Sequence, residues 1–258
     1  MENSKHGKLD RDAVNKILFF VIIILVVNMI FALIISYLWS VLDFLVILGL
    51  SLLTTSPAFF ANGGMTFTGK GDPIDRGKFF IDGKRIFGEG KTWSGLLGGI
   101  LAGLFIGFMF TLLFIPVRNF AGYITNLFEW DLVYVSYNEV LSFVHPAYME
   151  ILTINGVTQV PSIHFGFVIL GLRLVLLSIA APFGDLIGSF LKRRIGKERG
   201  EILPVIDQID FITFSILITY PIFPLRWYYI VTLLLITPLI ALIANYVIYR
   251  LGKKEVPW

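Results

Sequence analysis

The sequence lacks cysteine and is poor in charged residues, and both features narrow its function. None of the 258 residues is cysteine, which excludes disulfides, cysteine-ligated zinc and thiol chemistry. Only three histidines are present, too few for a histidine-rich metal cluster. Charged residues make up 15% of the chain against roughly 25% in soluble domains, while hydrophobic residues reach 56%. The composition therefore argues against a soluble globular domain.

Long uncharged runs predict a membrane protein. A membrane-spanning helix needs about 20 mainly apolar residues, and runs of this length recur along the chain. We therefore predict an all-α integral membrane protein with about six transmembrane helices, at 17–37, 42–60, 95–115, 163–191, 208–223 and 227–250. The first run is too long for the apolar core of a cleavable signal peptide and is predicted to stay as an anchor. Residues 1–16 then form a tail and 17–258 a single membrane domain.

The basic residues predict the orientation in the cell membrane. With six spans, the segments 1–16, 61–94, 192–207 and the C-terminal tail share one side, and this side carries 18 of the 21 Lys and Arg residues. Because basic residues accumulate in cytosolic loops, both termini and the loops 61–94 and 192–207 are predicted to be cytosolic. Basic residues placed in this way suit membrane lipids or phosphates, and no nucleic acid partner is expected.

The loop 117–160 is then predicted to lie outside the cell. Within it, Asn155-Gly156 stands between two short runs of residues that favour strands. This dipeptide is typical of a two-residue β-turn, so an external β-hairpin is predicted there.

The cytosolic loop 61–94 is rich in glycine and cations, as phosphate-binding loops are. Lys84, Arg85 and Lys91 precede the third helix, whose first backbone N–H groups also favour an anion. Gly90-Lys91-Thr92 resembles the end of a P-loop, but that motif requires glycine where this chain has Arg85. The loop is therefore not a P-loop. The alternative interpretation is that these cations only set the membrane topology.

Three carboxylates lie around the second cytosolic loop. On a helix, Asp185, Ser189 and Lys192 share one face, and Asp185 lies about two turns inside the membrane end, where a charge costs about 2.5–3.5 kcal/mol. Asp207 and Asp210 share a face at the start of the fifth helix. Carboxylates that approach one another repel unless a cation joins them, and oxygen ligands suit Mg²⁺. The three acids therefore predict a magnesium site, and ion pairs with the nearby arginines are the structural alternative.

These segments resemble a known enzyme family. The runs 184–194, 207–210 and 90–95 are similar to those of the integral-membrane cytidylyltransferases that make CDP-activated lipids. Pro57-Ala58 with Asn62, the runs 73–75 and 82–85 and the C-terminal run 245–258 narrow the resemblance to the archaeal branch, the CDP-archaeol synthases. The chain lacks the His-Gly-Gly before the final Asp-x-x-Asp of the bacterial phosphatidate enzymes. Its first span is additional to the five-span core of the archaeal branch.

The resemblance implies a catalytic membrane domain. Its reaction would transfer CMP from CTP to an isoprenoid ether-lipid phosphate, unsaturated archaetidic acid, with Mg²⁺ as cofactor. Catalytic roles are implied for Lys91, Asp185, Lys192, Asp207 and Asp210, with the three aspartates as magnesium ligands. Nucleotide binding is implied for Asn62, Asp75, Lys84, Arg85, Lys91, Thr92, Ser189, Lys192, Arg193 and Arg194.

Other functions stay open at this point. The first alternative is a phosphatidate cytidylyltransferase that acts on a diacyl lipid, and a membrane transporter or a lipid-binding scaffold is a weaker one. Arg173 near mid-membrane would suit a transporter, but transporter sites usually lie at the midplane between repeated halves. The acids of this chain gather near one membrane face, which favours the transferase.

The predicted orientation can be tested because the chain has no native cysteine. A single cysteine in place of Asn155 should react with an impermeant maleimide in intact cells, since the outer loop faces the medium. A single cysteine in place of Gly71 should react only after the membrane is opened. The opposite labelling pattern would overturn the orientation.

Overall fold

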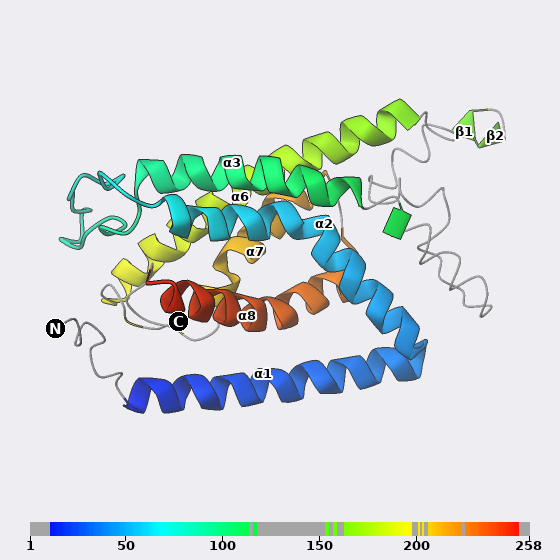
Figure 1. Ribbon diagram of the computed structural model, residues 1–258, viewed down its shortest axis with the longest axis horizontal. Coiled ribbons are helices and arrows are strands. Elements are labelled where there is room, and N and C mark those ends of the chain that lie inside the picture. The colour runs from blue at the N-terminus through cyan, green and yellow to red at the C-terminus, as the bar shows by residue number, and fades with distance from the viewer. Residues whose placement is uncertain are drawn as a thin grey trace.

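The computed structural model describes residues 11–113, 116–117, 153–154, 157–158, 163–197, 201, 203, 206–222 and 225–252. Its elements are α1 (Arg11–Leu38), α2 (Val41–Thr68), α3 (Trp93–Leu112), β1 (Thr153–Ile154), β2 (Val157–Thr158), α6 (Ile163–Arg194), α7 (Ile206–Thr219) and α8 (Trp227–Arg250). The strands pair antiparallel, Thr153 with Thr158 and Ile154 with Val157, which confirms the predicted hairpin. Figure 1 shows the start of α1, the end of α8 and the loop between α2 and α3 at one end of the molecule, with the hairpin at the other.

All six predicted helices are present, and the chain is a multi-pass membrane protein. Within the described ranges, five helices are long and apolar enough to cross a membrane: α1, α2, α3, α6 and α8. The exception is α7, which has 14 residues where the prediction extended to 223. At 1.5 Å per residue it is about 21 Å long, against a hydrocarbon core of about 30 Å. It ends at Thr219 because Pro221 disfavours helical backbone at the preceding residue.

The helix α2 continues past its predicted end at residue 60 and places Asn62 in a helix instead of a loop. A Cβ on Gly64 would lie 3.2 Å from the backbone of α3, so glycine at this position permits close helix packing. The other boundaries differ less, and the largest of these differences is at α1, which begins at Arg11 instead of 17 and so includes the end of the predicted tail 1–16. The helix α3 covers 93–112 instead of 95–115, and α6 continues to Arg194, so that Lys192, Arg193 and Arg194 lie on the helix.

The helix α2 is the centre of the bundle and contacts all five other helices. Its middle contains Pro57, and Figure 1 shows that α2 is bent along its length. Proline cannot donate the helical hydrogen bond to the carbonyl of Leu53, and the Ser56 hydroxyl donates to that oxygen instead, at 2.9 Å. The bend is therefore accommodated without a lost hydrogen bond.

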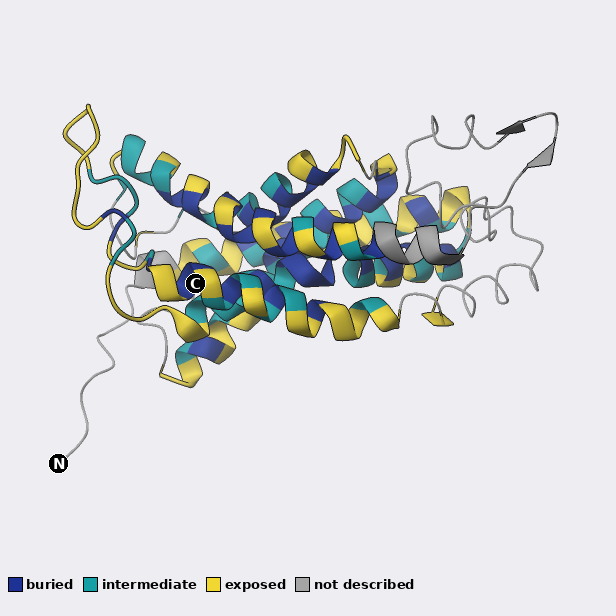
Figure 2. Cartoon of the chain, turned by 90° about the horizontal axis from the view of Figure 1, so that it is seen from above, coloured by how far each residue is buried: buried dark blue, intermediate teal, exposed yellow. Residues whose placement is uncertain are grey.

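Apolar side chains from five helices form the core. Its buried members include Ile35, Ile47, Leu50, Ala58, Ala61, Leu177, Ala181, Phe211, Ile212 and Leu233. Figure 2 shows buried residues where the helices face one another and exposed residues along their outer surfaces. Many of these exposed residues are large and apolar, among them Phe105 and Leu101 on α3. An outward apolar surface of this kind suits contact with lipid chains.

The helix α1 packs at the edge of the bundle. Phe20 and Ile24 form a small cluster with Leu242 of α8. The Asn28 side chain donates to the carbonyl of Leu235, also on α8, at 2.8 Å. An amide hydrogen bond between helices is valuable in lipid because no water competes for the polar groups. This contact fixes α1 beside α8.

The closest helix contact is between α2 and α3. Gly99, Gly103 and Gly107 are buried on the face of α3 that meets α2. A Cβ on Gly103 would lie 2.8 Å from the Pro57 carbonyl oxygen, and one on Gly107 would lie 2.8 Å from the Pro57 Cα. Both obstacles are backbone atoms and cannot turn aside. The glycine face of this helix is thus a packing surface, which sets the distance between α3 and the centre of the bundle.

The variant Gly103→Ala should lower the thermal midpoint of the purified protein in detergent. Its methyl group would overlap backbone of α2, and overpacking of this kind costs about 1–3 kcal/mol. Gly171→Ala on α6 is the matched control, because no atom of the residues that the structure describes lies within 4 Å of its Cβ position. Scanning fluorimetry of both variants provides the comparison. Equal midpoints would show that the α2–α3 contact is not tight.

Candidate active site

The loop between α2 and α3 folds back on itself before α3 begins. Pro73 pairs with Thr92, and the Ile74 N–H donates to the Lys91 carbonyl at 2.7 Å. Two sharp turns use glycine with positive φ, Gly83 at 72° and Gly88 at 115°, a region that side chains disfavour. These contacts bring the two ends of the loop together and hold Lys91 at the entrance of α3.

Thr92 starts α3. Its Oγ1 accepts a hydrogen bond from the Gly95 N–H at 3.1 Å, the usual role of threonine at a helix N-cap. The side chain is buried, with 5% of its surface exposed. Thr92 therefore fixes the point at which the helix begins, directly after Lys91.

Lys91 reaches across to α6 and forms an ion pair with Asp185. Lys91 Nζ donates to Asp185 Oδ2, and both side chains keep about a quarter or less of their surface exposed. The loop–α3 junction and α6 are 94 residues apart in sequence at this contact. The fold thus brings the predicted phosphate-binding lysine and the predicted metal-binding acid together.

A second lysine–carboxylate pair lies at the end of α6. Lys192 Nζ donates to Asp207 Oδ2 at 2.8 Å, and the Leu203 N–H donates to the same oxygen at 2.9 Å. Asp207 Oδ1 is buried and has no hydrogen-bond partner among the residues that the structure describes. A buried carboxylate oxygen without a partner is costly, so this atom can accept a further ligand.

Asp210 lies one turn further along α7 and faces Asp185. The charges of Asp185, Lys91 and Asp207 all act on its carboxyl group. A Cβ added at Gly188 would lie 2.9 Å from the Cβ of Asp210, so glycine at position 188 leaves room for Asp210 beside α6. Gly188 thus allows α6 and α7 to approach closely next to the buried Ser189.

The carboxylates of this region do not form a ready-made metal cluster among the described residues. In the described ranges, no three His, Asp or Glu side chains are already grouped as a set of metal ligands. Asp185 and Asp207 are instead each paired with a lysine. The donor chemistry nevertheless suits Mg²⁺, because all three candidate ligands are carboxylates and Asp207 Oδ1 accepts no hydrogen bond from the described residues.

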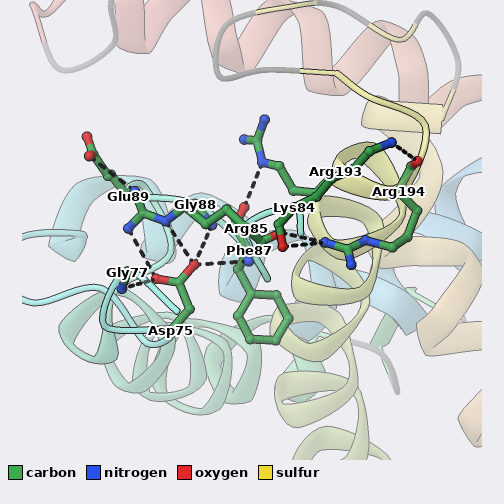
Figure 3. A network of polar contacts seen from close by, with 9 residues as sticks. All are labelled: Asp75, Gly77, Lys84, Arg85, Phe87, Gly88, Glu89, Arg193 and Arg194. Atoms are coloured by element: carbon green, nitrogen blue, oxygen red, sulfur yellow. Dashed lines mark hydrogen bonds and ion pairs between the residues drawn. The ribbon is translucent and has the colours of Figure 1, made fainter. Parts of the chain in front are cut away.

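The other predicted nucleotide-binding residues of the loop form a separate network, drawn in Figure 3. Asp75 is at its centre, with no exposed side-chain surface. Arg85 donates to both of its carboxylate oxygens, from Nε and Nη2 at 3.1 Å each. The backbone N–H groups of Gly77, Phe87 and Gly88 donate to them as well, at 3.0, 3.0 and 2.8 Å.

These contacts change the acidity of Asp75. Burial raises the pKa of its carboxyl group, but the hydrogen bonds from Arg85 and the three backbone N–H groups outweigh burial and hold the pKa well below its ordinary value. Because this pKa is lower in the folded state than in the unfolded state, the ionised Asp75 carboxylate stabilises the fold. This stabilisation is complete at pH values above the unfolded pKa of about 3.9. It is lost only as the pH falls through the lower folded value, so the network is intact at neutral pH.

Two arginines attach this loop to the end of α6. Arg193 Nε donates to the Phe87 carbonyl at 3.1 Å. Arg194 Nη2 donates to the Arg85 carbonyl at 2.6 Å, and Arg194 also pairs with Asp82. Lys84 Nζ returns a hydrogen bond to the Arg194 carbonyl at 2.6 Å. The loop is therefore fixed to the helix that carries Asp185 and Lys192.

Two aromatic residues of this attachment were not predicted from the sequence. The Arg194 guanidinium lies over the ring of Phe190 at 4.6 Å and over that of Phe80 at 5.0 Å. Such contacts favour a cation over an aromatic face. The spacing of Phe190 and Arg194, four residues apart on a helix, is the signal that could have indicated the pair.

Comparison with known proteins identifies the family. Residues 41–131 and 133–258 match the family described as CarS-like, CDP-archaeol synthase. The chain belongs to the CDP-archaeol synthase family. The match begins at the first residue of α2, so α1 lies outside it, as the resemblance had suggested.

Individual CDP-archaeol synthases are similar over most of the chain. That of Methanococcus aeolicus is 35% identical over 78% of this chain and 92% of its own. Those of Thermococcus onnurineus and Archaeoglobus fulgidus are each 34% identical, again over 78% of this chain. A solved structure, described as an intramembrane enzyme for archaeal membrane lipid biosynthesis, aligns with 75% of this chain at 24% identity and a TM-score of 0.49.

Family membership confirms two predictions. The chain is an enzyme of the CTP-dependent cytidylyltransferase class, and its activity is CDP-archaeol synthesis in archaeal membrane lipid biosynthesis. This favours the transferase over the transporter and scaffold interpretations. Of the predicted residues, the structure groups Lys91, Asp185, Lys192, Asp207 and Asp210 in one region, whereas Asp75 and Arg85 occupy the neighbouring loop network.

Proposed function

We propose that this CDP-archaeol synthase uses CTP and unsaturated archaetidic acid as its substrates. A lipid phosphate oxygen attacks the α-phosphorus of CTP, the bond from that phosphorus to the bridging oxygen breaks, and pyrophosphate leaves. The observation that carries the proposal is the meeting of two lysines and three aspartates at the α6–α7 end of an apolar helix bundle. A polar site beside a lipid-facing surface suits a reaction between a charged nucleotide and a membrane lipid.

The lysines fit the electrostatic demands of this reaction. A phosphate oxygen is already a nucleophile and needs no strong base, so the barrier comes from bringing two polyanions together and from charge on the departing pyrophosphate. Lys91 and Lys192 each hold a carboxylate through one N–H and have further N–H groups for phosphate oxygens. We assign them to neutralising the phosphates, with Lys91 nearer the pyrophosphate.

The three aspartates are proposed to hold Mg²⁺. The partnerless Asp207 Oδ1 and the carboxylate of Asp210 beside Asp185 support this assignment. Magnesium would supply charge neutralisation of the triphosphate. Each lysine can exchange a carboxylate for a phosphate oxygen, which leaves the carboxylate free to ligate a cation. Asn62 and Ser189 are proposed to help place the nucleotide.

The proposed orientation places this site in the cytosol, where CTP is made. The start of α1, the end of α8 and the loop 69–92 lie at the same end of the molecule, together with the end of α6 (Figure 1). This grouping supports the orientation predicted from the distribution of basic residues.

Incorporation of radiolabelled CTP into lipid by the purified protein tests the substrates. Labelled CDP-lipid should form with unsaturated archaetidic acid and Mg²⁺, and far less with diacyl phosphatidate. Equal incorporation with both lipids would show that the enzyme accepts a broader range of lipid phosphates than proposed. No labelled lipid with either substrate would refute the proposed function.

Lys91→Met should lower CMP transfer strongly without changing expression or folding. Removal of one charged contact to a developing anion costs about 2–4 kcal/mol in the activation barrier. The matched control is Lys78→Met, which removes a positive charge from an exposed position of the same loop. If the CMP-transfer rates of both variants lie within about twofold of the wild-type rate, Lys91 sets the membrane topology and does not stabilise the transition state.

Asp185→Asn, Asp207→Asn and Asp210→Asn should each abolish magnesium-dependent CTP binding. Asparagine keeps the shape but removes the charge on which affinity for a hard cation depends. Double variants should add little to the single losses, because the three acids act as one unit.

Isothermal titration of CTP at varied Mg²⁺ measures these effects. Asp72→Asn, at an exposed position of the loop, is the control. Wild-type binding by the Asp185→Asn and Asp207→Asn proteins would show that these acids are structural.

A further inference from the structure

We infer that Asp75 is a positioning residue, which sets Lys91 against Asp185 and does not contact the nucleotide. The inference rests on the function proposed above. It assigns a role to the loop network of Figure 3, whose members had been expected to bind CTP directly.

The first observation is that the Asp75 carboxylate is saturated. It accepts five hydrogen bonds, two from Arg85 and three from backbone N–H groups. A carboxylate offers about four lone-pair positions, so no acceptor capacity is left for a metal or a further donor. The side chain also has no exposed surface. A ligand could reach Asp75 only if the loop came apart.

The second observation is a short path from Asp75 to Lys91. Gly88 donates its N–H to Asp75 at 2.8 Å, and its carbonyl accepts the Lys91 N–H at 3.2 Å. On the other side, Ile74, the residue before Asp75, donates to the Lys91 carbonyl at 2.7 Å. Both backbone polar groups of Lys91 are therefore bonded to residues that Asp75 holds or adjoins.

The third observation is that the same network is attached to α6, the helix that carries Asp185. Arg193 and Arg194 bond to the carbonyls of Phe87 and Arg85, which flank the contacts to Asp75. Both arginines lie on α6, about two turns after Asp185. The network thus fixes Lys91 and Asp185 relative to each other through bonds that involve neither side chain.

A loop held in this way keeps Lys91 preorganised for catalysis before the substrates bind. Misplacement of a catalytic group by about 1 Å can cost a factor of about 100 in rate. Asp75→Asn replaces an acceptor oxygen with an NH₂ group that would face an N–H donor, so the turn at Gly88 should loosen. We expect kcat for CMP transfer to fall about 10- to 100-fold with little change in KM for CTP.

Arg85→Lys is the milder second variant. Lysine keeps the positive charge but cannot donate to both oxygens of Asp75 from a rigid fork. It should lower kcat in the same direction by a smaller factor. Asp72→Asn, an exposed acid of the same loop, is the control and should retain wild-type kcat.

A double-mutant comparison separates positioning from a general loss of stability. If Asp75 acts through Lys91, then Asp75→Asn combined with Lys91→Met should be no slower than Lys91→Met alone. Multiplication of the two single losses would overturn the inference. So would a large rise in KM for CTP with unchanged kcat, which would indicate direct nucleotide contact by Asp75.

A measurement without substrate keeps this inference distinct from the proposed function. Because the chain has no native cysteine, cysteines can be placed at positions 91 and 185 only, and joined with a short bis-maleimide. Asp75→Asn should lower the cross-linking yield severalfold, and Asp72→Asn should not. An unchanged yield refutes positioning by Asp75 even if CMP transfer is confirmed, whereas absence of CMP transfer in the wild type refutes only the proposed function.

Discussion

The ion pair between Lys91 and Asp185 is the contact on which the proposed chemistry of this site depends, and the surrounding contacts hold its two residues in place. It joins the start of α3 to α6 and so connects segments 94 residues apart. Lysine and aspartate are costly to bury alone, but each lowers the cost for the other where the bundle meets water. The loop, the two helices and the neighbouring Asp210 are all placed with respect to this pair, and the proposed chemistry uses both of its members.

Two sets of contacts hold Lys91 in position. The first is the close backbone packing of α2 and α3, and the second is the attachment of the loop to α6 by arginines. Gly103 and Gly107 let α3 lie against the bent middle of α2, which sets the position of the α3 start. Arg193 and Arg194 attach the preceding loop to α6. Lys91 thus lies between two rigid supports. This division suits a membrane enzyme, because helices packed by small residues need no hydrophobic driving force between them.

The cations of the loop and of the end of α6 divide into two groups with different surroundings. Lys91 and Lys192 hold carboxylates near the α6–α7 junction and keep donors for phosphate. Arg85, Arg193 and Arg194 each donate hydrogen bonds to acceptors within the loop. Arginine suits the second role because its planar fork bonds several acceptors at once, while lysine suits the first because its single ammonium can change partners. Proximity in sequence therefore does not imply a shared function.

The sequence alone determined the membrane class, the presence of all six helices, the hairpin and the enzyme family. These follow from run length, turn chemistry and linked motifs, which are local properties. Only the tertiary structure decided that α2 continues through Gly63-Gly64, that α7 has 14 residues, and that Lys91 pairs with Asp185. It also decided that Asp75 is saturated inside the loop. The physical reason is that a glycine, a lysine or an aspartate has several favourable partners, and only contacts between distant segments select among them.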